Sequence, residues 1–216
     1  MFRLSAFLPL LVISLFVSSC SKDSSTPSID IMGSDKPNIL LIIADDVGLD
    51  AMPGYAIGTT KPNMPTLESL ATNGIRFTNF WSNPTCTPTR SSILTGQYGF
   101  RVDVTQVGDE LSTSETSLQK FLTDNNSTYA NAVIGKWHLS NDANHPTNMG
   151  VDYYAGLLNG ATQSYSSWNF TQNGQTETSN EYITSKFSDL AIDWLGKQSE
   201  HWFLWLAYTA PHTPFH

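Results

Sequence analysis

Short apolar runs alternate with helical repeats of apolar residues from Pro37 onward. The runs rich in β-branched and aromatic residues predict strands, at 39–43, 75–80, 129–134 and 202–208. Apolar residues at helical spacing predict helices, at 65–73, 88–95, 114–123 and 181–197. Residues 140–180 are rich in Asn, Ser, Thr, Gly and Gln, so we predict loops or a weak hairpin there.

Strands that alternate with helices predict an α/β fold, with a mostly parallel (mixed) central sheet and helices on both faces. The run 39–43 is apolar at every position, which is expected of a strand buried on both faces. The helix over 181–197 has the clearest apolar face. Its members are Ile183, Phe187, Leu190, Ala191, Trp194 and Leu195.

The first residues have the features of an export signal. Arg3 precedes an apolar run over 6–17, which is too short to span a membrane. The run ends at Val17-Ser18-Ser19-Cys20, which resembles a bacterial lipobox, in which the Cys is lipidated and becomes the new N-terminus. We expect a lipoprotein-type signal peptide over 1–19, a polar tether over 20–36 and a folded domain over 37–216. An ordinary cleaved signal, with Cys20 present by chance, remains the alternative.

This interpretation places the protein outside the cytoplasm, anchored through lipid on Cys20 to the periplasmic or cell-surface side of the outer membrane. Cys86 is then a lone thiol in an oxidising compartment, where it needs either burial or a chemical task. The net charge of -8 and pI of about 4.9 provide no basic surface for nucleic acid, so we expect no nucleic-acid partner. Apolar residues make up 40% of the chain, enough for a packed core.

Polar side chains follow the predicted strands. Ligands of open parallel sheets bind beyond the carboxyl ends of the strands. Asp45 and Asp46 leave the first strand together, and adjacent carboxylates indicate a site for a hard cation, or else a capped turn. Cys86 lies at the start of the predicted helix, where the helix dipole favours an anion, and Arg90 lies one turn further on. The alternative is an inert buried Cys.

Two further segments carry histidines. Lys136 and His138 follow the strand 129–134, and in an extended chain both side chains point to the same side. A solvated loop is the alternative. His212 lies between Pro211 and Pro214, which stiffen the segment after the last strand. An incidental His in a turn is the alternative there.

Together these segments resemble one enzyme family. Cys86-Thr87-Pro88-Thr89-Arg90, with Leu94-Thr95-Gly96, is similar to the C-x-P-x-R and T-G signature of formylglycine-dependent (type I) sulfatases, of the alkaline-phosphatase-like superfamily. The Asp pair, Gly-Lys-x-His and Pro-His-x-Pro match further family motifs in order across 37–216. At the fourth position of the C-x-P-x-R motif this sequence has Thr89, whereas Ser or Ala is commoner in the family. This difference weakens the match to the motif that the maturation enzyme recognises.

The resemblance implies a sulfuric ester hydrolase, either arylsulfatase-like or a carbohydrate sulfatase. A maturation enzyme would convert Cys86 to formylglycine, whose hydrated diol attacks sulfur. Ca²⁺, favoured over Mg²⁺, would be held by Asp45, Asp46 and residue 86. Arg90 and Lys136 would bind the diol and the sulfate. His138 would be the base and His212 the acid, and the substrate would be a sulfated small molecule or sulfated carbohydrate.

Members of this family are longer, and the resemblance places their remaining metal ligands beyond His216. We therefore expect an incomplete N-terminal catalytic domain with weak Ca²⁺ binding and little or no activity, and with strand 202–208 near an open sheet edge. Two other readings stay open. One is a phosphonate or phosphate ester hydrolase on the same fold. The other is a truncated, non-catalytic, lipid-anchored glycan-binding relic.

Overall fold

A computed structural model describes residues 36–125 and 128–215. The expected signal peptide over 1–19, Cys20 and nearly all of the tether lie outside the described residues. In the part that is described, no helix combines the length and apolar character needed to cross a membrane.

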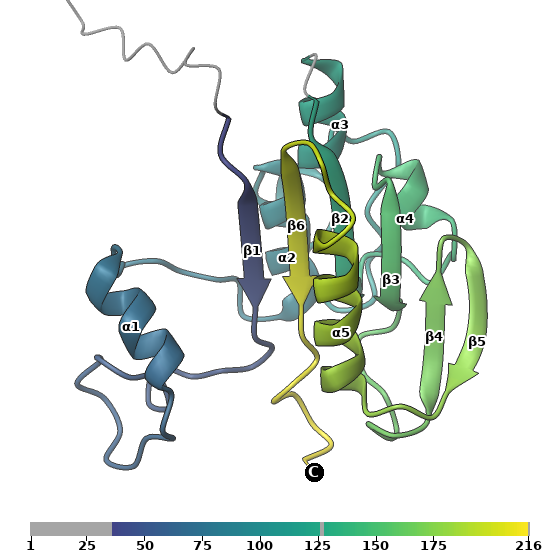
Figure 1. The fold of residues 1–216 in the computed structure, drawn as a ribbon. Helices are drawn as coiled ribbons and strands as arrows, with labels where there is room; N and C mark the ends of the chain where they lie inside the picture. The colour runs from purple at the N-terminus through teal and green to yellow at the C-terminus, as the bar shows by residue number, and fades with distance from the viewer. Residues whose placement is uncertain (1–35, 126–127, 216) are drawn as a thin grey trace, which may run out of the picture. The chain divides into compact units, whose positions relative to one another are not determined.

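The described residues contain one mixed six-stranded sheet, with the strand order β1-β6-β2-β3-β4-β5 (Figure 1). The strands are β1 (Ile39–Ile43), β2 (Ala130–Lys136), β3 (Tyr153–Leu157), β4 (Trp168–Gln172), β5 (Gln175–Ser179) and β6 (Trp202–Ala207). The first four strands in this order are parallel, whereas β4 and β5 form an antiparallel hairpin. The predicted α/β fold with a mostly parallel, mixed sheet is confirmed.

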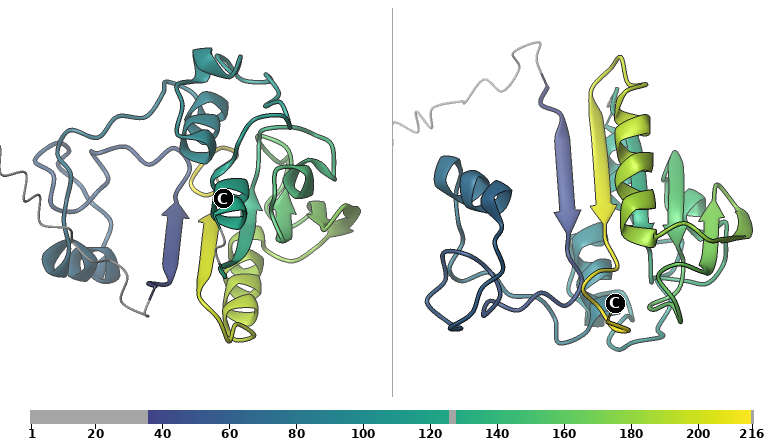
Figure 2. Two further views of the ribbon diagram at one scale, coloured as in Figure 1. Left: turned by 90° about the horizontal axis from the view of Figure 1, so that it is seen from above. Right: turned by 60° about the horizontal axis from the view of Figure 1, so that its bottom comes forward.

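Helices cover both faces of the sheet (Figure 2). On one face, α2 (Cys86–Thr95) and α3 (Leu118–Asp124) pack on Val133. On the other face, α5 (Ile183–Leu195) packs on Ala132 and Ile134. Neighbouring residues of β2 therefore enter different cores, because side chains of a strand alternate between its faces.

The helices follow their sequence signals closely. The first, α1 (Pro65–Asn73), has the predicted bounds, and Gly74 follows it. Helix α2 begins at Cys86, two residues earlier than predicted, and ends before Gly96, which adopts φ 69°. Helix α3 begins later than predicted, because the Ser117 hydroxyl accepts the Lys120 N–H and caps the helix. Two short elements were not predicted: the 3-10 helix η1 (Gly99–Arg101) and α4 (His145–Asn148).

Two strand predictions are wrong. Strand β1 is not buried on both faces, since Leu40 and Ile42, which point to the same face, are 46% and 52% exposed. Strand β6 lies near an open edge, as predicted, but the edge strand itself is β1, which pairs with β6 alone among the described strands. Residues 75–80 form no strand, since they pair with none of the described strands; Ile75 is 83% exposed.

Within 140–180, the hairpin prediction is confirmed by β4 and β5, but β3 was missed. Its sequence, Tyr-Tyr-Ala-Gly-Leu, is short and contains a Gly, which weakens a strand signal. Pairing with β2 along five residues places it in the buried part of the sheet.

Candidate active site

The carboxyl ends of three parallel strands bring the candidate segments together. Ile43 of β1, Ala207 of β6 and Gly135 of β2 lie in register across the sheet. Each strand leads directly into one predicted segment, so these segments meet at the same edge. The backbone N–H of Asp45 donates to the carbonyl of Ala210 at 3.1 Å, which joins the first segment to the last.

A buried ionic cluster forms the centre of the site. The Lys136 ammonium contacts the Asp45 carboxylate directly, and the Arg90 guanidinium Nη2 lies 3.7 Å from the same carboxylate oxygen. Arg90 Nη1 also donates to the Lys136 carbonyl at 2.6 Å. All three side chains are buried, so water screens their charges little. Two cations face one carboxylate, which leaves a net positive centre suited to an anion.

Arg90 of this cluster carries a charge that burial disfavours. Desolvation lowers the pKa of Arg90, and the nearby charge of Asp45 opposes this shift. Its Nε atom is buried without a hydrogen-bond partner among the described residues. A donor left in this state is a candidate contact for a ligand oxygen.

Cys86 lies beside an imidazole. Its Sγ is 3.1 Å from Nδ1 of His138, and the hydroxyl oxygen of Thr87 lies 3.3 Å from Nε2 of the same ring. Burial, and secondly the charge of Lys136, lower the pKa of His138 to about 4. The ring is therefore neutral near pH 7 and can exchange a proton with a group at position 86.

The chain turns sharply between Lys136 and His138. Lys136 is the last residue of β2, and His138 adopts φ 54°, so the extended conformation that we predicted across both residues is wrong. Both side chains nevertheless reach the site. Lys136 contacts Asp45, whereas His138 contacts Cys86.

His212 approaches from the segment after β6. Its Nε2 lies 3.7 Å from the Asp46 carboxylate, and its Nδ1–H donates to the carbonyl of Thr213 at 2.7 Å. The hydroxyl of Tyr165 donates to the His212 carbonyl at 2.6 Å, which holds the backbone of this segment. Nε2 is thus the ring nitrogen available on the side of Asp46.

An open cavity of about 280 Å³ adjoins these groups. Four of the candidate residues line it: Asp45, Asp46, Cys86 and Arg90. The other three, Lys136, His138 and His212, each contact one of these lining residues. The seven candidates thus form three contact groups around one cavity at the carboxyl edge of the sheet.

The metal ligands are not complete in this part of the chain. Residues 36–125 and 128–215 hold no group of three or more His, Cys, Asp or Glu side chains that could bind a metal ion. One oxygen of Asp45 already pairs with Lys136 and Arg90. Since Ca²⁺ takes about six to eight oxygen ligands, Asp45 and Asp46 would supply only part of a Ca²⁺ site.

Sequence reasoning missed several residues around the site. Thr87 occupies a variable place of the Cys86 motif, yet its hydroxyl lies against His138. The Tyr154 hydroxyl donates to the Gly135 carbonyl at 3.3 Å, and burial raises the pKa of Tyr154. Gly160 packs on the imidazole, and a Cβ there would lie 2.3 Å from ring atoms. A motif of fixed spacing carries no signal for residues from these other segments.

Residues 37–216 match the sequence model of one protein family, Sulfatase. The chain is 29% identical over 234 residues to the uncharacterized sulfatase YdeN of Escherichia coli (strain K12), covering 83% of this chain and 41% of that protein. It is 39% identical over 130 residues to arylsulfatase G of Mus musculus, covering 56% and 24%. The chain thus spans less than half the length of these curated relatives.

Solved structures agree with this match. The complex of BT4656 with its substrate D-glucosamine-2-N,6-O-disulfate is similar at a TM-score of 0.73 and 26% identity, covering 82% of this chain and 35% of that one. The phosphonate monoester hydrolase of Agrobacterium radiobacter is similar at a TM-score of 0.57 and 20% identity, covering 83% and 42%. This second likeness shows the fold alone.

Proposed function

Because the chain belongs to the sulfatase family, we propose that this protein hydrolyses sulfate esters with a nucleophile made from Cys86. One observation carries the proposal. Cys86 opens helix α2, 3.1 Å from a neutral imidazole, and the buried Arg90 beside it belongs to a cluster with a net positive charge. A reactive group and an anion-binding centre therefore adjoin the same cavity.

The chemistry needed is the displacement of an alkoxide from an anionic ester. Formylglycine, which a maturation enzyme would make from Cys86, would supply a hydrated carbonyl with two hydroxyls. One would attack sulfur as the alcohol leaves, and loss of the proton from the other would re-form the aldehyde as the bond to sulfate breaks. Arg90 and Lys136 bind the sulfate oxygens, and their fixed charges stabilise the charge that develops there. Asp45 holds both cations in place and limits their net charge.

Protons move through the two histidines. Neutral His138 accepts the proton of the hydroxyl at position 86, consistent with its lowered pKa and the 3.1 Å contact. His212 donates a proton to the leaving oxygen. Its Nε2 lies 3.7 Å from the carboxylate of Asp46, on the side of the cavity.

The substrate class that we propose is a sulfated carbohydrate or small sulfate ester. The named substrate of BT4656 is a disulfated glucosamine, and arylsulfatase G is named for aryl sulfates. Asp45, Asp46 and the group at position 86 would supply oxygen ligands to a Ca²⁺ ion.

We also propose that the protein is exported and anchored in the bacterial envelope through lipid on Cys20. The support is the sequence of residues 1–36 alone: an apolar run, Val17-Ser18-Ser19-Cys20, and a polar tether.

The deciding experiment joins peptide mass analysis with kinetics. Protein purified from its natural host is digested, and the mass of the Cys86 peptide reports formylglycine. Turnover of matched aryl sulfate, phosphate and phosphonate esters is then compared. We expect the modified peptide and a preference for sulfate. A preference for phosphonate or phosphate favours the related hydrolase activity, and an unmodified Cys86 without turnover favours a glycan-binding relic.

A further inference from the structure

The backbone at His138 is in an uncommon state. Its φ of 54° lies in the left-handed region, which residues with a Cβ rarely adopt. Such a conformation persists only where surrounding contacts hold it. The backbone N–H groups of Trp137 and His138 donate to the Leu157 and Leu158 carbonyls at 2.9 and 3.0 Å, which holds the backbone but not the side chain of Trp137.

The residue before His138 is anchored in the core. Trp137 is fully buried, and its ring packs against Tyr154 and Trp205 at centroid distances of 6.0 and 6.3 Å. Its indole N–H donates to Nδ1 of His145 at 3.0 Å. This bond satisfies a buried donor that water cannot reach, so losing the acceptor leaves the indole N–H unpaired.

His145 continues the chain of contacts. It is buried, and its Nε2–H donates to the Leu111 carbonyl at 2.7 Å. The Leu111 N–H in turn donates to the Leu139 carbonyl at 3.0 Å. Because a backbone carbonyl can only accept, the proton of His145 lies on Nε2, and Nδ1 is free to accept from Trp137. The neighbours of His138 in the sequence are Trp137 and Leu139. Three hydrogen bonds therefore join these two residues, through His145 and Leu111.

We propose that His145 is a positioning residue, which holds Trp137 and thereby keeps the imidazole of His138 against the group at position 86. This inference rests on the proposed function, because it assigns His145 a purpose through His138. His145 itself contacts neither Cys86 nor the cavity: its partners are the indole of Trp137 and the carbonyl of Leu111.

Unmodified Cys86 provides a readout that needs no sulfatase activity. Its Sγ lies 3.1 Å from Nδ1 of His138, so the neutral imidazole is placed to take the thiol proton when Cys86 attacks the reagent. The rate of alkylation by iodoacetamide at one fixed pH, followed on the Cys86 peptide by mass analysis, therefore reports the position of His138. General loosening of the fold acts in the opposite direction, because it exposes the half-buried thiol and accelerates alkylation.

Two single variants remove the same hydrogen bond from opposite sides. His145→Gln can still donate to Leu111 but withdraws the acceptor from Trp137, whereas Trp137→Phe withdraws the donor. We expect each to slow alkylation of Cys86 about fivefold, the factor that one net hydrogen bond is worth. In the double variant the loss should equal that of one single variant, because both changes break one bond.

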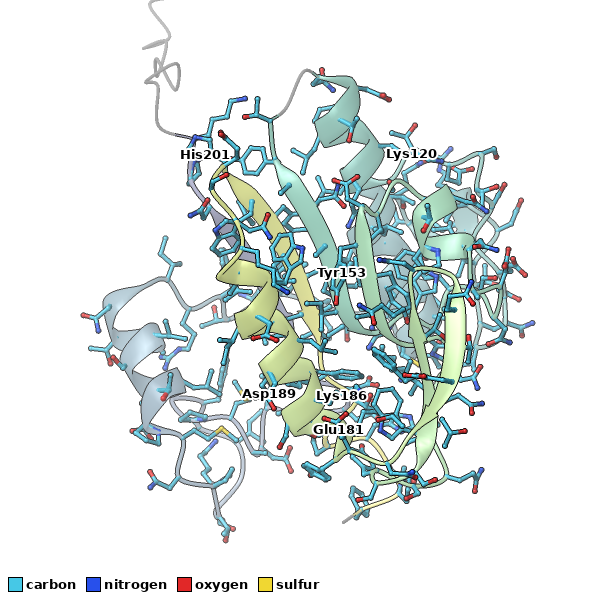
Figure 3. All side chains as sticks on the ribbon, turned by 45° about the vertical axis from the view of Figure 1, so that its right-hand side comes forward. Lys120, Tyr153, Glu181, Lys186, Asp189 and His201 are labelled. Atoms are coloured by element: carbon cyan, nitrogen blue, oxygen red, sulfur yellow. The ribbon has the colours of Figure 1, made fainter. Side chains whose placement is uncertain are left out.

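The matched controls are His145→Asn and His201→Gln. Asn keeps an acceptor near the place of Nδ1, so it should restore most of the rate. His201 precedes β6 at the amino end of the sheet (Figure 3), and its replacement should leave the rate unchanged. Urea unfolding of every variant shows that folded protein is being compared.

Wild-type alkylation rates in folded His145→Gln and Trp137→Phe would overturn the proposal, as would losses that multiply in the double variant. If one single variant does not fold, the rate of the other decides. A negative result leaves the sulfatase assignment intact, because no step of this test measures ester hydrolysis. Conversely, absence of sulfatase turnover leaves the role of His145 to be decided by the alkylation rates.

Discussion

Lys136 is a buried charged side chain whose replacement should cost stability. It is 0% exposed, and its ammonium contacts the carboxylate of Asp45, which is 5% exposed. Lys136→Met keeps the length of the side chain but removes its charge. The Asp45 carboxylate then stays buried, with the guanidinium of Arg90 as its remaining cation at 3.7 Å.

The size of this effect follows from the environment of the pair. Breaking a buried ion pair by removing one partner costs roughly 3–5 kcal/mol. Because Arg90 still offsets part of the charge of Asp45, we expect the low end, a loss of about 3 kcal/mol in the free energy of unfolding. For a domain of this size, that corresponds to a fall of roughly 6–12 °C in Tm.

Urea unfolding followed by tryptophan fluorescence measures the loss. The matched control is Lys186→Met, because Lys186 forms a 2.8 Å pair with Glu181, whose side chain is 69% exposed (Figure 3). The Glu181 carboxylate is solvated, so this ion pair contributes about 1 kcal/mol. The Lys186 side chain is 14% exposed, and its ammonium lies 4.3 Å from the centroid of the Phe170 ring. Asp45→Asn combined with Lys136→Met should recover much of the lost stability, since no buried charge is then left without its partner.

Two results would refute this reasoning. The first is a loss for Lys136→Met no larger than that of the surface control. The second is strict additivity of Asp45→Asn and Lys136→Met, which means that the two charges do not interact. Either result would show that the cluster is more hydrated than the described geometry implies.

The remaining predictions concern positions 86, 20 and 138 and the carboxylate pair. In the full-length enzyme, we expect Cys86→Ala to abolish turnover. Cys86→Ser should yield at most a trapped sulfated enzyme, detected by mass analysis, because a single hydroxyl cannot form the carbonyl that expels sulfate. Steady turnover by the Ser variant would contradict the diol mechanism. We expect the 216-residue chain to bind Ca²⁺ weakly in calorimetry and to show little or no turnover of aryl sulfates. The reason is that Asp45 and Asp46 supply only part of the roughly six to eight oxygen ligands that Ca²⁺ takes. Micromolar affinity together with multiple turnovers would show that no other ligands are needed. Cys20→Ala releases the protein from membranes in cell fractionation, and unchanged partitioning places the anchor elsewhere. His138 has its pKa lowered from 6.5 to about 4, so the unfolded chain takes up this proton first and the free energy of unfolding falls as the pH drops from 6.5 towards 4. The urea midpoint of the wild type should therefore fall more across this window than that of His138→Gln, and equal falls contradict the lowered pKa.

Local patterns were sufficient for elements whose own residues define a buried face. The apolar positions of α5 and the run in β6 predicted both elements to within two residues. Sequence patterns failed to predict strands where pairing with another strand decides whether a segment becomes a strand. Residues 75–80 have strand-like composition but pair with none of the described strands, whereas the weak sequence of β3 pairs with β2 along its whole length. A strand is stabilised by hydrogen bonds to the strand beside it, and the composition of a segment does not identify that strand.

The sequence by itself determined which residue types lie in the candidate segments: the carboxylates, Cys86, the cations and the two histidines. Their motifs are local, so spacing and residue type are enough to recognise them. Only the tertiary structure decided which of them touch. Lys136 contacts Asp45, which lies 91 residues earlier in the sequence, and His138 contacts Cys86, which lies 52 residues earlier. The sheet places β6 between β1 and β2, so the ends of strands that are distant in the sequence lie at one edge. His145 belongs to none of the motifs recognised in the sequence. Its bond to Trp137 arises from the packing of α4 against the sheet, a contact that depends on the whole chain being folded.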